Sequence, residues 1–162
     1  MTSVKEIGAL SGIKVIDLTR VLSGPFCTML LADMGADVIK IEPPKGDNVR
    51  NQGDMVEGYS SYFAQFNRNK KSVILDLYVE SEKDILRSLL SDADVVVENF
   101  KAGVFDKMGF DYNTLKIVTG GHIHNPHYYA YMRNAGLQAR NPGDIPCGGL
   151  IRFLDLFNDI NH

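Results

Sequence analysis

The chain has 162 residues, 44% of them hydrophobic and 23% charged, which is ordinary for a globular protein with one core. Its formal net charge of −3 gives no basic stripe, so we expect no nucleic acid partner. No apolar run is long enough to cross a bilayer, and the N-terminus lacks the apolar centre of a signal peptide. Cys27 and Cys147 are typical of free thiols in a reducing compartment, so we predict a soluble cytoplasmic protein with no membrane partner.

The first elements in chain order form a strand–helix–strand unit. From Gly12, "GIKVIDLT" is rich in residues that favour strands, and "SGPF" then marks a turn. "CTMLLADMGA" has apolar residues at helical spacing, and Gly35 is placed to end that helix. "DVIKIEPP" is a second strand, which the two prolines stop. The short connections predict parallel pairing with a right-handed crossover.

The next segments repeat the alternation after a polar loop. "KGDNVRNQGDMVEGYSS" is interpreted as loop, "YFAQFNRNKK" as a short helix and "SVILDL" as a strand. "SEKDILRSLLSDA" is predicted to be an amphipathic helix, with Ser81 as its N-cap and Asp84 in the first turn. The three valines of "DVVVEN" predict a strand buried on both faces. "GVFDKMGFDYNTLK" is predicted to be a helix, a break at Gly109 and a second short helix.

The sequence therefore predicts an α/β fold with a Rossmann-like, mainly parallel sheet over residues 12–116. After Lys116 no helical or strand period is sustained, so residues 117–162 are predicted to form an irregular, poorly specified C-terminal tail.

Ligands of open parallel sheets bind beyond the carboxyl ends of the strands. Three predicted strand ends carry unusual residues, in "LTRVLSGP", "EPPKGD" and "VENFKAG". Asn99 and Phe100 are placed there to hydrogen-bond a ligand and to flank it with a ring. The alternative is structural: Asn99 caps the following helix, and Phe100 is a core residue at the corner.

Other motifs point away from metal or simple nucleophile chemistry. The chain has no P-loop pattern and no G-x-G-x-x-G after a strand. The H-x-H-x-x-H run at residues 122–127 matches no helical ligand pair, so we predict loop histidines and no metal site. Cys27 is interpreted as a small buried thiol without a base. Asp17 and Asp76 are interpreted as turn or pairing residues.

Three blocks in this order closely resemble the N-terminal part of family III CoA-transferases of the CaiB/BaiF type. They are "GIKVIDLTRVLSGPFCTMLLADMGADVIKIEPPKGD", "FNRNKKSVILDL" and "DADVVVENFKAGVFDKMGFDYNTL". This family includes formyl-CoA transferase and alpha-methylacyl-CoA racemase, and its larger domain is Rossmann-like and binds coenzyme A. The resemblance covers residues 12–116, about two thirds of the chain and much less than half of a family member. Relative to a full-length member, the predicted sheet is incomplete.

The resemblance implies the site residues. Val21 and Leu22 would lie at the CoA site, Leu75 against the adenine side, and Asn99 and Phe100 in contact with the cofactor. Lys107, where the family usually has a basic residue, would face the CoA phosphates. One departure is that formyl-CoA transferase has an arginine for the phosphates after "IKIE", where this chain has Pro43-Pro44 and, as a possible substitute, Lys45.

The resemblance also implies the activity and the assembly. Family members transfer CoA between an acyl-CoA and a carboxylic acid, using an aspartate nucleophile, and they are interlocked homodimers. The "GYGQTGP"-like block that precedes that aspartate is missing from the 162 residues, so no catalytic residue is predicted. Residues 144–159 weakly resemble a stretch near the family's C-terminal end, but Asp144, Asp155 and Asp159 lack the nucleophile's context.

We therefore expect a truncated or internally deleted family member that is inactive alone. Two alternatives are a non-catalytic CoA-binding module and a fragment of the acyl-CoA racemase branch. A third is a structural remnant that binds no CoA.

Overall fold

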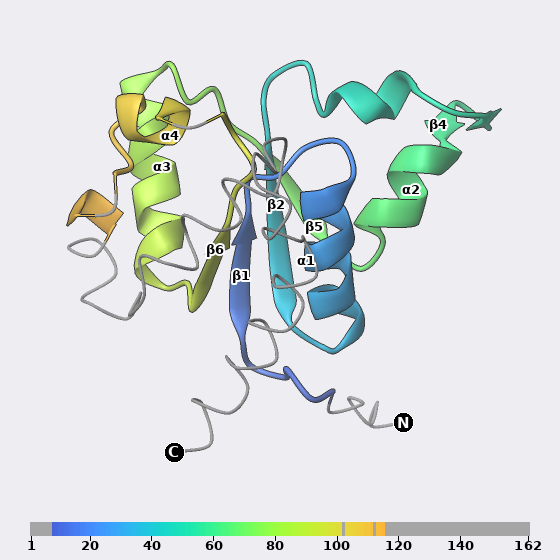
Figure 1. Ribbon diagram of the computed structural model, residues 1–162, viewed down its shortest axis with the longest axis horizontal. Coiled ribbons are helices and arrows are strands. Elements are labelled where there is room, and N and C mark those ends of the chain that lie inside the picture. Colours follow the sequence, from blue (N-terminus) through green and yellow to red (C-terminus); the bar gives the residue numbers. More distant parts are fainter. Residues whose placement is uncertain (1–7, 102, 112, 116–162) are drawn as a thin grey trace, which may run out of the picture.

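The computed structural model describes residues 8–101, 103–111 and 113–115. Its centre is a four-stranded parallel sheet in the order β5-β2-β1-β6, formed by β1 (Lys14–Asp17), β2 (Asp37–Glu42), β5 (Lys71–Ile74) and β6 (Val95–Val97). Helices α1 (Ser23–Asp33) and α2 (Ser61–Asn67) lie on one side of this sheet, and α3 (Glu80–Ser91) and α4 (Val104–Lys107) lie on the other (Figure 1). The predicted α/β fold with a mainly parallel, Rossmann-like sheet is confirmed.

The β1–α1–β2 unit follows the prediction except at the start of the helix. β1 and β2 pair in parallel, with Val15 opposite Val38. Helix α1 begins at Ser23 rather than near Cys27, because Pro25 falls in the first turn, where a helix needs no N–H from it. Gly35 has a φ of +102°, and its N–H donates to the Ala32 carbonyl, so it ends the helix as predicted.

The segment predicted to be loop contains short regular elements. It holds the 3₁₀ helix η1 (Asn48–Asn51) and a hairpin of two-residue strands, β3 (Met55–Val56) and β4 (Tyr59–Ser60). These elements are too short to produce a hydrophobic period in the sequence. The predicted short helix is α2, whose N-cap Ser60 accepts a hydrogen bond from the Phe63 N–H.

Three predictions for the β5–α3–β6 unit were wrong in detail. Ser81 lies inside α3, whose N-cap is Val79 without a side-chain cap, and the acidic residues of the first turn are Glu80 and Glu82 rather than Asp84. The valine strand β6 is an edge strand of the described sheet, with Val97 buried but Val95 and Val96 only half-buried. Val96 packs against one core of the sheet, and Val95 and Val97 pack against the other. In the described sheet, however, β6 has a neighbouring strand on one side only, so it is less covered than a central strand.

Apolar residues on the two faces of the sheet form two cores. Val15, Val38 and Val97 pack towards α1, and Ile16 and Ile41 pack towards α3 and α4. The fold is thus a three-layer arrangement in which β1 and β2 contribute to both cores. The connection from β1 to β2 runs through α1 on one face, and the connection from β5 to β6 runs through α3 on the other face. The two connections therefore diverge between the neighbouring strands β1 and β6.

The end of the described chain follows the predicted break. Gly109 has a φ of +88°, two residues after α4, and of the described residues that follow it, 113–115 are helical whereas 110 and 111 are not. The predicted tail at 117–162 lies outside the described residues. Within the described ranges, no helix is both long and apolar enough to cross a membrane.

Candidate ligand site at the carboxyl ends of the strands

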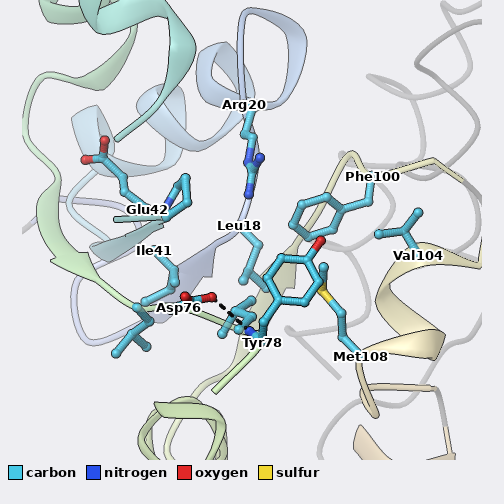
Figure 2. A pocket seen from close by; sticks show the side chains of 12 residues that line it. Leu18, Arg20, Ile41, Glu42, Asp76, Tyr78, Phe100, Val104 and Met108 are labelled. Carbon is cyan, nitrogen blue, oxygen red and sulfur yellow. Dashed lines mark hydrogen bonds between the residues drawn. The ribbon is translucent and has the colours of Figure 1, made fainter. Parts of the chain in front are cut away.

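Two adjoining hollows lie where the strands of the parallel sheet end, and Figure 2 shows the inner one. The inner hollow, of about 190 Å³, is lined by residues at or after the strand ends, among them Leu18, Glu42, Leu75 and Phe100, and by Val104 and Met108 at α4. The outer hollow, of about 330 Å³, shares four lining residues with it and adds Lys83 and Lys107. The shared residues are Leu77, Tyr78, Val104 and Met108. A small-molecule site is expected at this end of a parallel sheet.

The structure brings several of the predicted site residues together. Leu75 and Phe100 line the inner hollow, and Lys107 lines the outer hollow. Phe100 also packs against the core ring of Phe105, with 5.8 Å between their centroids. The ring is therefore both a core contact and a wall of the hollow, so the two interpretations of Phe100 are compatible. Lys45 is exposed and does not belong to either lining.

Val21 and Leu22 belong to neither lining. They follow Arg20, which lines the inner hollow, and they are 46% and 44% exposed. Val21 has a φ of +73°, which is strained for a β-branched residue. Such a conformation persists only when surrounding interactions fix it.

Asn99 fixes this loop rather than capping a helix. Its Oδ1 accepts from the Arg20 N–H at 2.9 Å, and its Nδ2 donates to the Arg20 carbonyl at 2.8 Å. The side-chain amide thus joins the ends of β1 and β6, where the crossovers diverge. The structural alternative, a cap of the following helix, does not apply, since α4 has Gly103 at its N-cap and no side-chain cap.

A buried network of ion pairs lies under the same loop, on the α1 side of the sheet. Lys70 Nζ is 3.0 Å from Asp17 Oδ2, and Lys40 Nζ is 3.1 Å from Asp47 Oδ2. All four side chains are essentially inaccessible to solvent. Lys40 Nζ also donates to the Thr19 carbonyl at 2.7 Å. The network therefore connects the strand ends directly to the loop that carries Val21.

Asp17 is a pairing residue, as the sequence suggested. Its Oδ1 accepts from the backbone N–H and the hydroxyl of Thr19, and its Oδ2 accepts from Thr28 and Lys70. Burial lowers the pKa of Lys70, although the nearby Asp17 carboxylate opposes that shift. Four donated hydrogen bonds leave Asp17 no free lone pair for acid–base chemistry in this geometry.

Glu42 ends β2 and accepts four hydrogen bonds. Arg50 donates to both of its oxygens at 2.6 Å, and Ser72 Oγ and the Asp47 N–H complete the set. Burial opposes the charge, but these donors together outweigh it and lower the pKa of Glu42 to about 2. Glu42 is therefore a structural anion rather than a proton donor near neutral pH.

Cys27 lies close to the buried network and is protonated at neutral pH. Burial, reinforced by the Asp17 charge, raises the pKa of its thiol from 9.0 to about 11. This supports the interpretation of Cys27 as an inert thiol. The histidine run lies outside the described residues, and within those residues no cluster of three or more His, Cys, Asp or Glu could hold a metal ion.

Sequence reasoning missed Arg20 and Tyr78, which both line the inner hollow. The Arg20 guanidinium lies 5.3 Å from the Phe100 ring centroid, and the Tyr78 N–H donates to Asp76 Oδ1 at 3.0 Å. Figure 2 shows the Arg20 side chain extending towards Leu18, alongside the ring of Phe100. The one available signal was that Arg20 comes directly after a predicted strand end.

Comparisons with known proteins identify relatives of the chain. A family model described as CoA-transferase family III matches residues 10–120. The chain is 47% identical over 136 residues to succinyl-CoA:mesaconate CoA-transferase of Haloarcula hispanica, covering 80% of this chain and 33% of that protein. It is 47% identical over 115 residues to acetyl-CoA:oxalate CoA-transferase of Acetobacter aceti, covering 70% and 30%. The chain thus spans about a third of the length of these relatives.

A solved structure has the same fold. A CAIB/BAIF family protein from Brucella suis superimposes with a TM-score of 0.66 at 44% identity, over 70% of this chain and 31% of that one. The resemblance noted in the sequence blocks is therefore confirmed by both sequence and fold.

Proposed function

Because the chain belongs to CoA-transferase family III, we propose that its described residues bind coenzyme A in the two hollows at the carboxyl ends of the strands. The family acts on CoA thioesters. The observation that carries the proposal is the convergence of Leu75, Phe100 and Lys107 on adjoining hollows at the expected end of a parallel sheet. The apolar lining suits a base or pantetheine arm, and the lysines suit phosphates.

Each proposed contact has a chemical reason. Phe100 and Leu75 offer apolar surface to the adenine, and Lys107 offers a charge to the phosphates. Asn99 contributes through its loop and retains one N–H beyond the bond to Arg20. Val21 and Leu22 are exposed in the loop that carries Arg20 and would cover the thiol-bearing arm.

Titration calorimetry with CoA tests the proposal directly. We expect saturable binding by the full chain, weakened about threefold to tenfold by Lys107→Met, since one charge-assisted contact is lost. Lys71→Met is the matched control, because Lys71 is an exposed lysine that pairs with Asp37 at the amino ends of the parallel strands. Absence of CoA binding by the wild-type chain would overturn the proposal and favour a structural remnant.

For the whole protein, we propose CoA transfer between an acyl-CoA and a carboxylic acid. Support comes from the names of the relatives, which are CoA-transferases for succinyl-CoA with mesaconate and for acetyl-CoA with oxalate. These names favour the transferase over the racemase branch. Since the 162 residues lack the block that precedes the family's nucleophilic aspartate, we expect no turnover by this chain alone. Turnover of succinyl-CoA with mesaconate or oxalate above the buffer rate would contradict this, and binding without turnover identifies a CoA-binding module.

Homodimer formation is a further proposal for this chain. Helix α1 is apolar on both sides, and its outer side exposes Leu22, Phe26 and Leu30 at intervals of four residues. Exposed apolar stripes of this kind are typical of interfaces. Sedimentation velocity of the wild type and of Phe26→Glu tests this: a dimer that dissociates in the variant is expected, and a monomeric wild type would refute it.

A further inference from the structure

We infer that Arg20 is the residue of the inner hollow that binds an anionic group of the ligand, and that Asn99 is the positioning residue that aims it. The inference rests on the proposed binding of CoA. It concerns a side chain for which neither the sequence blocks nor the comparisons give a role. Three features carry it: an unpaired guanidinium, a locked backbone, and a hollow in front of the charge.

The Arg20 guanidinium has no acidic partner among the described residues. Arg50, Arg68 and Arg87 each form an ion pair at 2.6 to 2.8 Å. Arg20 forms none within the described part of the chain, and its buried Nε has no hydrogen-bond partner there. The described residues therefore leave the Arg20 charge uncompensated, and an anion bound in the hollow that Arg20 lines would compensate it.

The backbone that carries Arg20 is fixed on both sides. The Asn99 amide holds the N–H and the carbonyl of Arg20 itself. The preceding carbonyl of Thr19 accepts from the buried Lys40 Nζ at 2.7 Å. The following residue, Val21, keeps its strained φ of +73°. Strain that the surroundings maintain is characteristic of binding sites.

The charge faces the inner hollow, with one face covered by a ring. The guanidinium lies 5.3 Å from the Phe100 centroid, and Figure 2 shows it beside that ring and above Leu18. Two carboxylates also line the hollow, but Glu42 is occupied by its four donors, and Asp76 accepts from the Tyr78 N–H. Neither forms an ion pair with Arg20 within the described residues. The N–H groups of the Arg20 guanidinium suit a phosphate or a carboxylate, because a planar guanidinium binds either group in a bidentate manner.

The outer hollow has two cationic side chains in its lining, Lys83 and Lys107, and neither of them lines the inner hollow. Lys83 is paired with Glu80 at 3.0 Å, whereas Arg20 is unpaired. Each of the two adjoining hollows therefore has a positive group in its lining that the other lacks. This matches a ligand with two separated anionic groups, such as the ribose 3′-phosphate and the diphosphate of CoA.

Calorimetric titrations of the full-chain Arg20→Gln variant with CoA, dephospho-CoA and succinyl-CoA test the inference. We expect CoA to bind roughly tenfold to a hundredfold more weakly than to the wild type, with Arg20→Lys intermediate. A loss with CoA but not with dephospho-CoA identifies the 3′-phosphate, and an equal loss with both identifies the diphosphate. A loss only with succinyl-CoA identifies the carboxylate. Arg68→Gln is the matched control, because Arg68 pairs with Asp33 away from both hollows.

The role of Asn99 is tested by a double-mutant cycle. If Asn99 acts through Arg20, Asn99→Ala weakens CoA binding in the wild-type background and has little effect in the Arg20→Gln background. Equal losses in both backgrounds would overturn the positioning role. Wild-type affinity of Arg20→Gln for all three ligands, with the wild type binding CoA, would overturn the inference alone. A wild-type chain that binds none of the ligands would overturn the proposed function and the inference with it.

Discussion

Replacing Glu42 by glutamine should remove a large part of the acid sensitivity of the fold. The Glu42 pKa is about 2 in the folded chain against 4.5 for the free group, so its charge stabilises the fold above pH 4.5. That contribution is lost as the pH falls from about 5 to 2. The full shift corresponds to about 3 kcal/mol, and we expect about 2 kcal/mol because the partner Arg50 is 39% exposed and therefore screened by solvent.

The glutamine is nearly isosteric but chemically wrong at this position. Both oxygens of Glu42 accept two hydrogen bonds, so the amide NH₂ of glutamine would meet two donors whichever way it turned. We therefore expect Glu42→Gln to lower the free energy of unfolding by about 3 to 5 kcal/mol at pH 7. The milder Ser72→Ala removes one donor and should cost about 1 kcal/mol.

Urea unfolding followed by far-UV circular dichroism, at pH values between 7 and 3, measures both effects. Other carboxylates also titrate in this range, so the informative quantity is the difference between wild type and variant. That difference should shrink as the pH falls below about 4.5. A difference that stayed constant down to pH 3 would refute the assignment of the low pKa to Glu42. If Glu42→Gln does not fold, Ser72→Ala gives the same readout on a smaller scale.

Three further predictions concern other parts of the fold. Val21→Gly should raise the free energy of unfolding by about 1 kcal/mol because it relieves the positive φ, whereas the control Val56→Gly in the exposed strand β3 should lower it. Urea unfolding measures both variants, and a lower free energy of unfolding for Val21→Gly would contradict the strain at this position. Leu86→Ala, at a fully buried position of α3, should cost about 2 to 5 kcal/mol, and Ile85→Ala, at a neighbouring position 49% exposed, under about 1 kcal/mol. Cys27, with a thiol pKa of about 11, should resist iodoacetamide at pH 8 in the native chain and react in urea. Mass spectrometry of peptides locates the label, and rapid labelling of Cys27 in the native chain would show that its thiol is accessible and ionised.

The sheet could be predicted from the sequence because its signals are local. Alternating strands and helices, Gly35 after the first helix and the prolines after "IKIE" each act within a few residues. The errors arose where local signals compete or are too short. Pro25 suggests a turn, but it is equally compatible with the first turn of a helix, and two-residue strands produce no period.

The site was predicted in part for the same reason. Ligands of parallel sheets bind at the carboxyl ends of the strands, so the position of Asn99 and Phe100 after a strand predicts that they belong to the site. The partner of Asn99 is Arg20, 79 positions away, and no local pattern indicates that hydrogen bond. Lys40 is similarly hidden, since a lysine in an alternating strand suggests a face in solvent, yet it is buried against Asp47.

The buried ion pairs beneath the loop have a consequence for how such sequences diverge. Asp17 and Lys70 neutralise each other out of contact with water, so a neutral residue at either position alone leaves an uncompensated charge in the interior. Exchange of both for apolar residues of similar volume leaves no uncompensated charge, although the buried Thr19 N–H then loses its acceptor. Related sequences should therefore retain Asp17 and Lys70 together or lose them together, because a chain with only one of the two would be less stable.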